Sequence, residues 1–382
     1  MNLASRLNTI QEYYFSNKLR EIAELKKNGV DVINLGIGNP DLPPAEEVIN
    51  TLNLESQNPS NHGYQGYKGI DELRNAYSNW YQKYFNVLLQ PDNEILPLMG
   101  SKEGIMHISL AFLEKGSQVL IPNPGYPAYA SAAKIAEAEL IYYDLTERGN
   151  WLPNIQELEK LDLSRVKIMW INYPNMPTGY IATSNELQKI ADFGKRNDIL
   201  ICNDNPYAFI LNKNQQSILQ FSDSKSHILE LNSLSKSHNM AGWRLGMIGA
   251  NKDIIESILK VKSNMDSGMF YGIQKGAIAA LKLESSWFDK LNVVYAERRE
   301  AMIELATLMG STFDPKSVGM FLWAKLDDPS IKSEEFIDEI LKEHHIFITP
   351  GTIFGSQGEG YIRFSLCVKL EDIQTAINRL KS

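Results

Sequence analysis

The chain has 382 residues, of which 43% are hydrophobic and 22% charged, so it can bury a large core and has room for two domains. Its net charge of −8, without a block of Lys or Arg, argues against a nucleic-acid partner. No run reaches the ~18 apolar residues that span a bilayer, and the polar first residues lack the apolar region of a signal peptide, so we expect no membrane partner and a cytoplasmic location.

The first part of the chain predicts an arm, a helix and a short strand. The strand ends in a turn with Gly36 and Gly38, where the backbone can approach a ligand closely or simply reverse direction. A loop rich in Gly and Tyr follows at residues 64–69, and it leads into a helix that begins near Ile70.

Between residues 98 and 249 short apolar strands alternate with helices. This alternation is typical of an α/β domain with a mostly parallel sheet. Thr183 and Glu186 form a capping box that opens one of the helices. Strands are predicted at residues 118–121, 140–143, 166–171, 199–202, 228–232 and 246–249.

Polar side chains follow several of these strands. In parallel sheets, ligands bind beyond the carboxyl ends of the strands, so these side chains are expected to converge. Ser101 and Lys102 open a helix, and its N–H groups and dipole suit a phosphate. Asp204 with Tyr207 and then Lys236 follow later strands, so an anion cradle, a carboxylate, a phenol and an amine would share one edge.

Lys236 lies in a stretch rich in hydroxyls after a buried strand. An amine in such a polar site can form a Schiff base with an aldehyde, while Ser233 and Arg244 could hold an anion beside it. The same pattern alone is also that of a surface loop with a solvated lysine. The residues after 273 predict a smaller α+β domain, with strands at 319–326, 346–349 and 360–366 and a helix at 333–343.

In this order, the residues resemble the class I and II aminotransferases, pyridoxal-phosphate enzymes of fold type I. The resemblance covers essentially the whole chain and includes Asp204-x-x-Tyr207, Lys236, Arg244, the turn Pro177-Thr178-Gly179, and Arg363-Phe364-Ser365. It implies a large domain over residues 46–272, with a mostly parallel seven-stranded sheet flanked by helices. Residues 273–382 would form the small α+β domain, to which the arm, 1–45, would contribute. It also implies a homodimer.

The resemblance assigns roles to the polar residues. Lys236 would hold pyridoxal 5′-phosphate as a Schiff base and later move the substrate proton. Asp204 would pair with the protonated pyridine nitrogen, and Tyr207 would hydrogen-bond the 3′-oxygen. Contacts to the ring, the phosphate and the substrate carboxylate are implied for Tyr126, Ser101, Lys102, Ser233, Ser235, Arg244, Gly38 and Arg363, and for Tyr64 of the neighbouring subunit.

One position departs from the family. Where the family has Asn before Pro-Thr-Gly, this chain has Met176, and a thioether cannot donate a hydrogen bond to the 3′-oxygen. Either Asn175 substitutes for the missing asparagine or Tyr207 acts alone, and we favour Tyr207. The pKa of the Schiff base is then expected to be less depressed than is usual for the family.

The spacing of the cysteine and histidine residues predicts no metal site. Cys202 and Cys367 lie in apolar runs, so we expect both to be buried and reduced. Reduced thiols are typical of cytoplasmic proteins. His344 and His345 have no ligand partners in the sequence, and no cluster has zinc spacing. His238, although close to Lys236, matches no catalytic position of the family.

The resemblance implies ping-pong transfer of an amino group from an L-amino acid to a 2-oxo acid such as 2-oxoglutarate. Residues 262–270 resemble a segment of the alanine, methionine and LL-diaminopimelate aminotransferases. With Tyr13, Tyr14 and Phe15 they favour a neutral, apolar or aromatic side chain. A C–S β-lyase on the same scaffold remains an alternative. A regulator with this fold is a second alternative, against which the acidic net charge argues.

Overall fold

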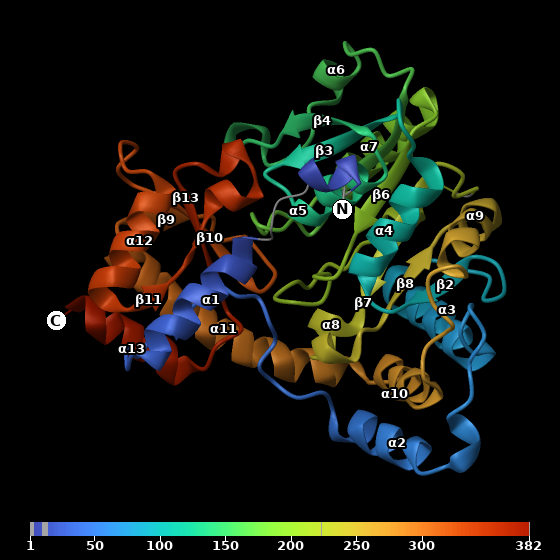
Figure 1. Cartoon of the computed structure of the whole chain (residues 1–382), viewed down its shortest axis with the longest axis horizontal. Helices are drawn as coiled ribbons and strands as arrows, with labels where there is room; N and C mark the ends of the chain where they lie inside the picture. The colour runs from blue at the N-terminus through green and yellow to red at the C-terminus, as the bar shows by residue number, and fades with distance from the viewer. Residues whose placement is uncertain (1–3, 10–13, 223, 382) are drawn as a thin grey trace.

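The computed structural model describes residues 4–9, 14–222 and 224–381. In this part of the chain, seven strands form one large sheet, with a smaller set of strands beside it (Figure 1). The order across the large sheet is β2 (Ile95–Leu98), β8 (Gly246–Gly249), β7 (Ile228–Ser233), β6 (Leu200–Asp204), β5 (Val166–Ile171), β3 (Gln118–Asn123) and β4 (Glu139–Asp144).

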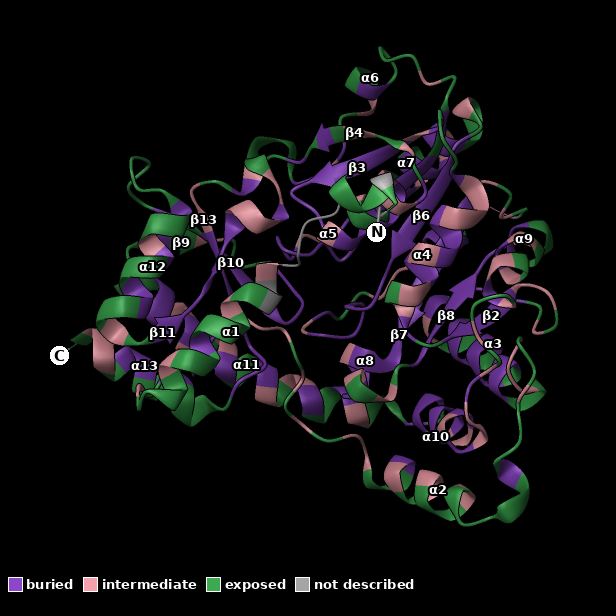
Figure 2. Ribbon diagram, in the orientation of Figure 1, coloured by how far each residue is buried: buried purple, intermediate pink, exposed green. Residues whose placement is uncertain are grey.

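The large sheet is parallel except for β8, which runs antiparallel to both of its neighbours. Its inner strands are near-continuous apolar runs, because helices cover both faces. In β5, for example, every residue but Lys167 is buried, and the inner strands of the large sheet are mostly purple in Figure 2. The predicted fold class is confirmed.

Side chains alternate between the two faces of the large sheet. Ile168 and Trp170 pack on one face against α4 (Ser101–Phe112), α5 (Pro127–Ile135) and α9 (Lys252–Lys262). Met169 and Ile171 pack on the other face, in the cluster that holds α3 (Asp71–Phe85) and α7 (Ser184–Asn197). The helix α7 begins at the predicted capping box, in which Glu186 accepts a hydrogen bond from the Thr183 N–H at 2.7 Å.

The smaller part contains two sheets and most of the C-terminal helices. Two strands, β1 (Ile33–Asn34) and β11 (Ile346–Phe347), pair in parallel, and an antiparallel sheet has the order β12 (Thr349–Pro350), β13 (Tyr361–Ser365), β10 (Phe321–Leu326), β9 (Ser311–Phe313). The helices here are α1 (Tyr14–Lys27), α11 (Ser285–Leu308), α12 (Ser333–His344) and α13 (Leu370–Lys381).

The prediction of a single strand at residues 346–349 is wrong. Residues 346–347 pair with β1 in one sheet, whereas residues 349–350 pair with β13 in another. One straight strand could not reach both partners, so the chain breaks between them.

The remaining helices are short or lie at the edge of the large sheet. They are α2 (Glu46–Ser56), α6 (Ile155–Leu158), α8 (Leu234–Ser237) and α10 (Tyr271–Leu281), with 3₁₀ turns η1 (Ser5–Thr9), η2 (Pro59–Asn61), η3 (Glu147–Gly149), η4 (Ile218–Phe221), η5 (Ala241–Trp243), η6 (Gly351–Phe354) and η7 (Ser356–Gly358). Although α10 follows the boundary predicted at residue 272, it packs against α2 and α3. The division into three ranges stays a prediction.

Two further expectations concern the cysteines and the membrane. Cys202 and Cys367 are both buried and unpaired, as expected. Among the helices of the described ranges, none has the length and apolar character needed to cross a bilayer.

Candidate active site

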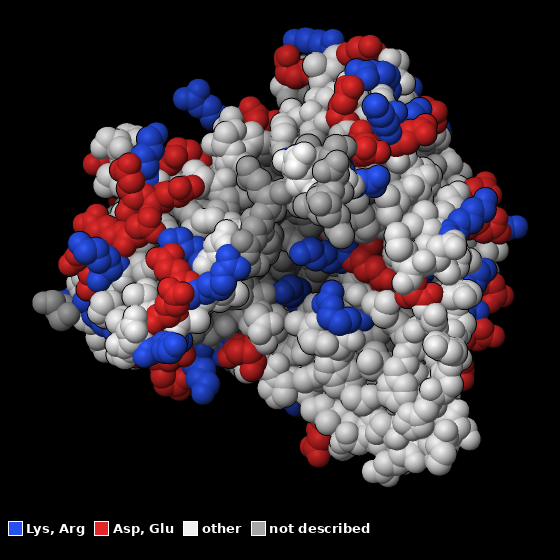
Figure 3. Space-filling model, in the orientation of Figure 1, with Lys and Arg blue, Asp and Glu red and all other residues white. Residues whose placement is uncertain are grey.

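A cavity of about 430 Å³ lies where the carboxyl ends of the large-sheet strands face the smaller part of the chain. The space-filling view shows a hollow in the middle of the molecule, with Lys and Arg side chains gathered in it (Figure 3). Most of the predicted site residues line this cavity: Gly38, Ser101, Lys102, Tyr126, Asp204, Tyr207, Ser233, Ser235, Lys236, Arg244 and Arg363. Tyr64 and Asn175 do not line it.

Lys236 enters the cavity from the short helix α8, directly after β7 ends at Ser233. Its Nζ donates a hydrogen bond of 2.6 Å to the carbonyl of Gly38. Burial lowers the pKa of this amine, and the nearby cations Arg363 and Arg244 lower it further, against an opposing effect of Cys367. A larger fraction of neutral amine makes Lys236 a better nucleophile toward an aldehyde.

Asp204 stands at the carboxyl end of β6 with its two oxygens in different situations. Tyr129 Oη donates to Oδ2 at 3.0 Å, while no described residue donates a hydrogen bond to the buried Oδ1. Burial raises the pKa of Asp204 to about 7; the hydrogen bond from Tyr129 opposes this shift and the carboxyl of Glu230 adds to it. A protonated ring nitrogen would supply the donor that Oδ1 lacks, so pyridoxal phosphate fits this residue.

The N-terminus of α4 and the arginine of a neighbouring loop form a cradle with room for an anion. Gly100 has a φ of 90°, which favours glycine, and a Cβ at this position would lie 2.2 Å from Arg244 Nη2, so a side chain here would displace the guanidinium. The hydroxyls of Ser233 and Ser235 lie 2.8 Å apart beside it. Helix N–H groups, hydroxyls and a guanidinium are the donors that a phosphate requires.

Arg363 lies on β13 with its guanidinium over two aromatic rings. Its guanidinium carbon is 4.0 Å from the ring centroid of Phe321 and 4.7 Å from that of Phe354. Nη2 donates to the carbonyl of Gly36 at 2.8 Å, and Nη1 lies 3.4 Å from Met176 Sδ. A guanidinium fixed in this way is suited to bind a carboxylate through two hydrogen bonds.

The structure separates Asn175, which lies outside the cavity, from Met176, which lies in it as the sequence suggested. The side chain of Asn175 bonds within its own turn, where Oδ1 accepts from Thr178 Oγ1 at 2.7 Å and Nδ2 donates to the carbonyl of Asn172 at 3.2 Å. Met176 lines the cavity, and its N–H donates to Asn172 Oδ1 at 2.7 Å. The neighbouring amide therefore does not take the place of the missing asparagine.

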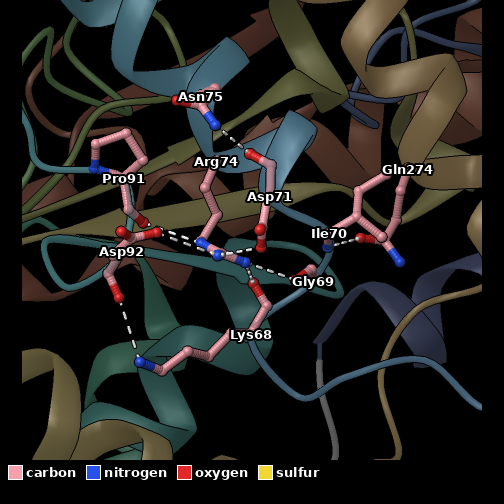
Figure 4. A network of polar contacts seen from close by, with 9 residues as sticks. All are labelled: Lys68, Gly69, Ile70, Asp71, Arg74, Asn75, Pro91, Asp92 and Gln274. Atoms are coloured by element: carbon pink, nitrogen blue, oxygen red, sulfur yellow. Dashed lines mark hydrogen bonds and ion pairs between the residues drawn. The ribbon is translucent and has the colours of Figure 1, made fainter.

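Tyr64 is 94% exposed on the loop before α3. This loop is held at its C-terminal end by Arg74, which donates to the carbonyls of Gly69 at 2.7 Å and Pro91 at 3.0 Å (Figure 4). The amide of Ile70 donates to Gln274 Oε1 at 2.8 Å, which ties the loop to α10. The loop thus has a fixed root and presents Tyr64 on the surface.

Sequence analysis missed several residues of the cavity. Tyr129 could have been found, because it lies in the first turn of α5, three positions after Tyr126, the N-cap residue of that helix. Asn172 was not missed: the stretch that begins with it follows directly on β5 and was expected at this edge of the sheet, where Asn172 lines the cavity and donates to the carbonyl of Asp204. Phe321 and Phe354 carry no local signal, since only the tertiary fold brings them to Arg363.

One cluster outside the cavity has ligand atoms close enough for a metal ion among the described residues: Glu103, His107 and Asp266. Lys262 Nζ lies 2.8 Å from both oxygens of Asp266, in an ion pair that is almost completely buried. An ammonium group already neutralises this carboxylate, so the cluster is described as a structural ion pair.

The model of the family "Aminotransferase class I and II" matches residues 30–380. An LL-diaminopimelate aminotransferase of Dehalococcoides mccartyi is 39% identical over 382 residues, which cover 100% of this chain and 98% of that protein. Substrate-bound BacF from Bacillus subtilis is similar with a TM-score of 0.94 and 32% identity, covering 100% of this chain and 98% of that one.

A mutant of the aspartate aminotransferase from Thermus thermophilus shares the fold, with a TM-score of 0.92 at 21% identity over 99% of this chain and 98% of that one. The predicted family and cofactor are confirmed by these similarities together with the match to the family model. The chain belongs to the class I and II aminotransferases, the transaminases that depend on pyridoxal phosphate.

Proposed function

We propose that the protein transfers an amino group from an L-amino acid with a neutral, apolar or aromatic side chain to a 2-oxo acid such as 2-oxoglutarate, by a ping-pong mechanism. One observation carries this proposal. The charged side chains that line the cavity each have a role in holding the cofactor or the α-carboxylate, and they are Lys102, Asp204, Lys236, Arg244 and Arg363. The walls that remain for a substrate side chain are mainly apolar, and include Leu19, Ile37, Met176, Phe321 and Phe354.

The residues of the large sheet would act on the substrate Cα. Pyridoxal phosphate supplies an acceptor for the electrons released when the bond at Cα is broken. Asp204 would keep the ring nitrogen protonated, and Lys236, with its lowered pKa, would take the Cα proton and return it at the cofactor carbon. Tyr207 would act alone on the 3′-oxygen, because Met176 has no hydrogen to donate.

The other residues would bind and orient the cofactor and the substrate. Tyr126 would stack on the cofactor ring. The phosphate would be held by Ser101, Lys102, Ser233, Ser235 and Arg244. Arg363, together with the backbone at Gly38, would hold the α-carboxylate, so that the Cα–H bond is presented to Lys236.

We also propose that the protein acts as a homodimer, in which each copy contributes to the active site of the other. Exposed apolar side chains lie on α2 and on the two loops near it: Leu54 is 69% exposed, Tyr64 94% and Met265 59%. Few charged side chains occur over α2 and α10 on the face that Figure 3 shows. A second copy of the chain would cover these side chains and receive Tyr64 in its own cavity. The free buried cysteines support a cytoplasmic location.

Side-chain specificity is tested by a half-reaction screen. The purified protein with pyridoxal phosphate is mixed with single amino acids, and the cofactor absorbance is followed as it converts to the pyridoxamine form. We expect the fastest conversion with neutral or aromatic amino acids. LL-diaminopimelate belongs in the screen because a relative is named for it; if it reacts best, the proposed specificity is wrong. Release of pyruvate and thiol from cystathionine, without amino transfer, would instead establish a β-lyase.

A further inference from the structure

We propose that Met176 is a positioning residue for substrate recognition: its sulfur orients the guanidinium of Arg363 for the α-carboxylate. The inference rests on the proposed function, in which Arg363 binds that carboxylate. Met176 stands where the family has an asparagine. Under this proposal the methionine contributes a contact of its own at that position.

The backbone of Met176 is held rigidly. Its N–H donates to Asn172 Oδ1 at 2.7 Å, and the following turn is closed by a hydrogen bond of 2.7 Å between the side chains of Thr178 and Asn175. Asn172 also donates to the carbonyl of Asp204, so the methionine is tied to the strand that carries the catalytic carboxylate. Met176 is only 6% exposed, and its side chain faces the cavity.

The guanidinium of Arg363 is restrained in two different ways. Its guanidinium carbon lies 4.0 Å from the ring centroid of Phe321 and 4.7 Å from that of Phe354, and these cation–π contacts restrain its movement. Rotation within the plane is restrained at the edge, where Gly36 O accepts from Nη2 at 2.8 Å and Met176 Sδ lies 3.4 Å from Nη1. These two edge contacts favour one orientation of the guanidinium within its plane.

A thioether suits this position because it accepts a hydrogen bond only weakly. A carboxylate here would neutralise Arg363 and compete with the substrate, whereas a plain hydrocarbon would remove the contact that Nη1 makes with the sulfur. The contact with the sulfur orients the cation. It is much weaker than the two charge-assisted hydrogen bonds that an incoming carboxylate would form with Arg363.

The test compares substitutions of Met176 in the protein loaded with pyridoxal phosphate. Met176→Leu keeps the volume and removes the acceptor, and Met176→Gln keeps the length and offers an amide acceptor. Met169→Leu, a buried methionine on β5 away from the cavity, is the matched control. The probe is 3-phenylpropionate, a carboxylate without an amino group, and its dissociation constant is measured by calorimetry.

We expect Met176→Leu to bind the probe about three- to tenfold more weakly, the effect of one modest hydrogen bond, with unchanged affinity for the cofactor. Met176→Gln and Met169→Leu should stay within about twofold of the unmodified protein. The proposal is overturned if Met176→Leu also stays within that range, or if the Gln and Leu variants weaken equally, since shape alone would then matter. Failure of the unmodified protein to transfer amino groups would instead refute the proposed function.

Discussion

Asp204 shows how a single side chain is kept in an unfavourable state for function. It is buried beside another buried carboxyl group, Glu230, and one of its oxygens has no donor among the described residues. A buried carboxylate without a counter-charge is costly, and its pKa near 7 expresses this cost. Such strongly shifted groups at a cavity are typical of functional sites.

The cofactor-free protein should therefore become less stable as the pH rises. Because the pKa of Asp204 is raised on folding, its favourable contribution is complete below the ordinary value near pH 4 and is lost as the pH passes about 7. Between these limits the free energy of unfolding should fall by roughly 4 kcal/mol in the unmodified protein. The Asp204→Asn variant has no carboxyl group to titrate, so it should not show this fall. Denaturant unfolding of both proteins at several pH values measures this. Parallel stability profiles would show that Asp204 titrates normally.

At this scale the sequence predicted which polar side chains meet at the cavity better than it predicted what surrounds them. Lys236, Asp204 and Arg363 were found because they follow strands or match a family motif, and these are local signals. The ring pair around Arg363 was not found, since Phe321 and Phe354 belong to different elements and meet only in the folded chain. The hydrogen bonds that keep Asn175 inside its turn were equally invisible in the sequence.

The helix α4 is the element on which the anion cradle depends. Gly104 lets it approach the sheet closely, because a Cβ there would lie 2.5 Å from Leu98 Cδ1 and 2.7 Å from Leu231 Cδ2. Gly100 lets Arg244 reach its N-terminus. The close packing and the open N-terminus together place helix N–H groups at the cavity, where an anion is favoured by the helix dipole.

Gly100→Ala should weaken binding of pyridoxal phosphate by at least about tenfold, since the new methyl group would displace Arg244 from the cradle. Gly116→Ala is the matched control: its φ of 93° is equally strained for alanine, but nothing lies within 4 Å of the new Cβ. Both variants should lose similar stability, as measured by thermal unfolding without cofactor. Equal cofactor affinity in the two variants would contradict the role given to Gly100.

Elements were predicted well where a strong apolar period or a cap marked them. The inner strands and α7, with its capping box, are of this kind. Residues 346–350 were not, because the division between β11 and β12 is decided by their partners β1 and β13 and not by local pattern.

At the scale of the whole molecule, the cavity is shared between parts of the chain that are far apart in sequence. Leu19 of α1 and Arg363 of β13 face the strand ends of the large sheet across it. Tyr64 lies outside the cavity and is exposed, as are the apolar side chains of Leu54 and Met265. This arrangement is what a dimer with shared active sites requires.

Met265→Glu should therefore weaken the dimer, because it places a charge among apolar side chains that a second copy would cover. Leu161→Glu, which is 43% exposed and lies just after α6, far from α2 in Figure 1, is the control and should remain dimeric. Light scattering over a range of concentrations measures both. If the unmodified protein is a monomer, or if both variants dissociate alike, the proposed surface is wrong.

The central claim is that Lys236 carries the chemistry, and single-turnover absorbance tests it most directly. The protein and its Lys236→Ala variant are loaded with pyridoxal phosphate and mixed with an amino acid that reacts in the half-reaction screen. Conversion to the pyridoxamine form should fall by at least about 10³-fold in the variant. Lys282→Ala, at the exposed end of α10, should react like the unmodified protein. Amino transfer at an undiminished rate in Lys236→Ala would contradict the account.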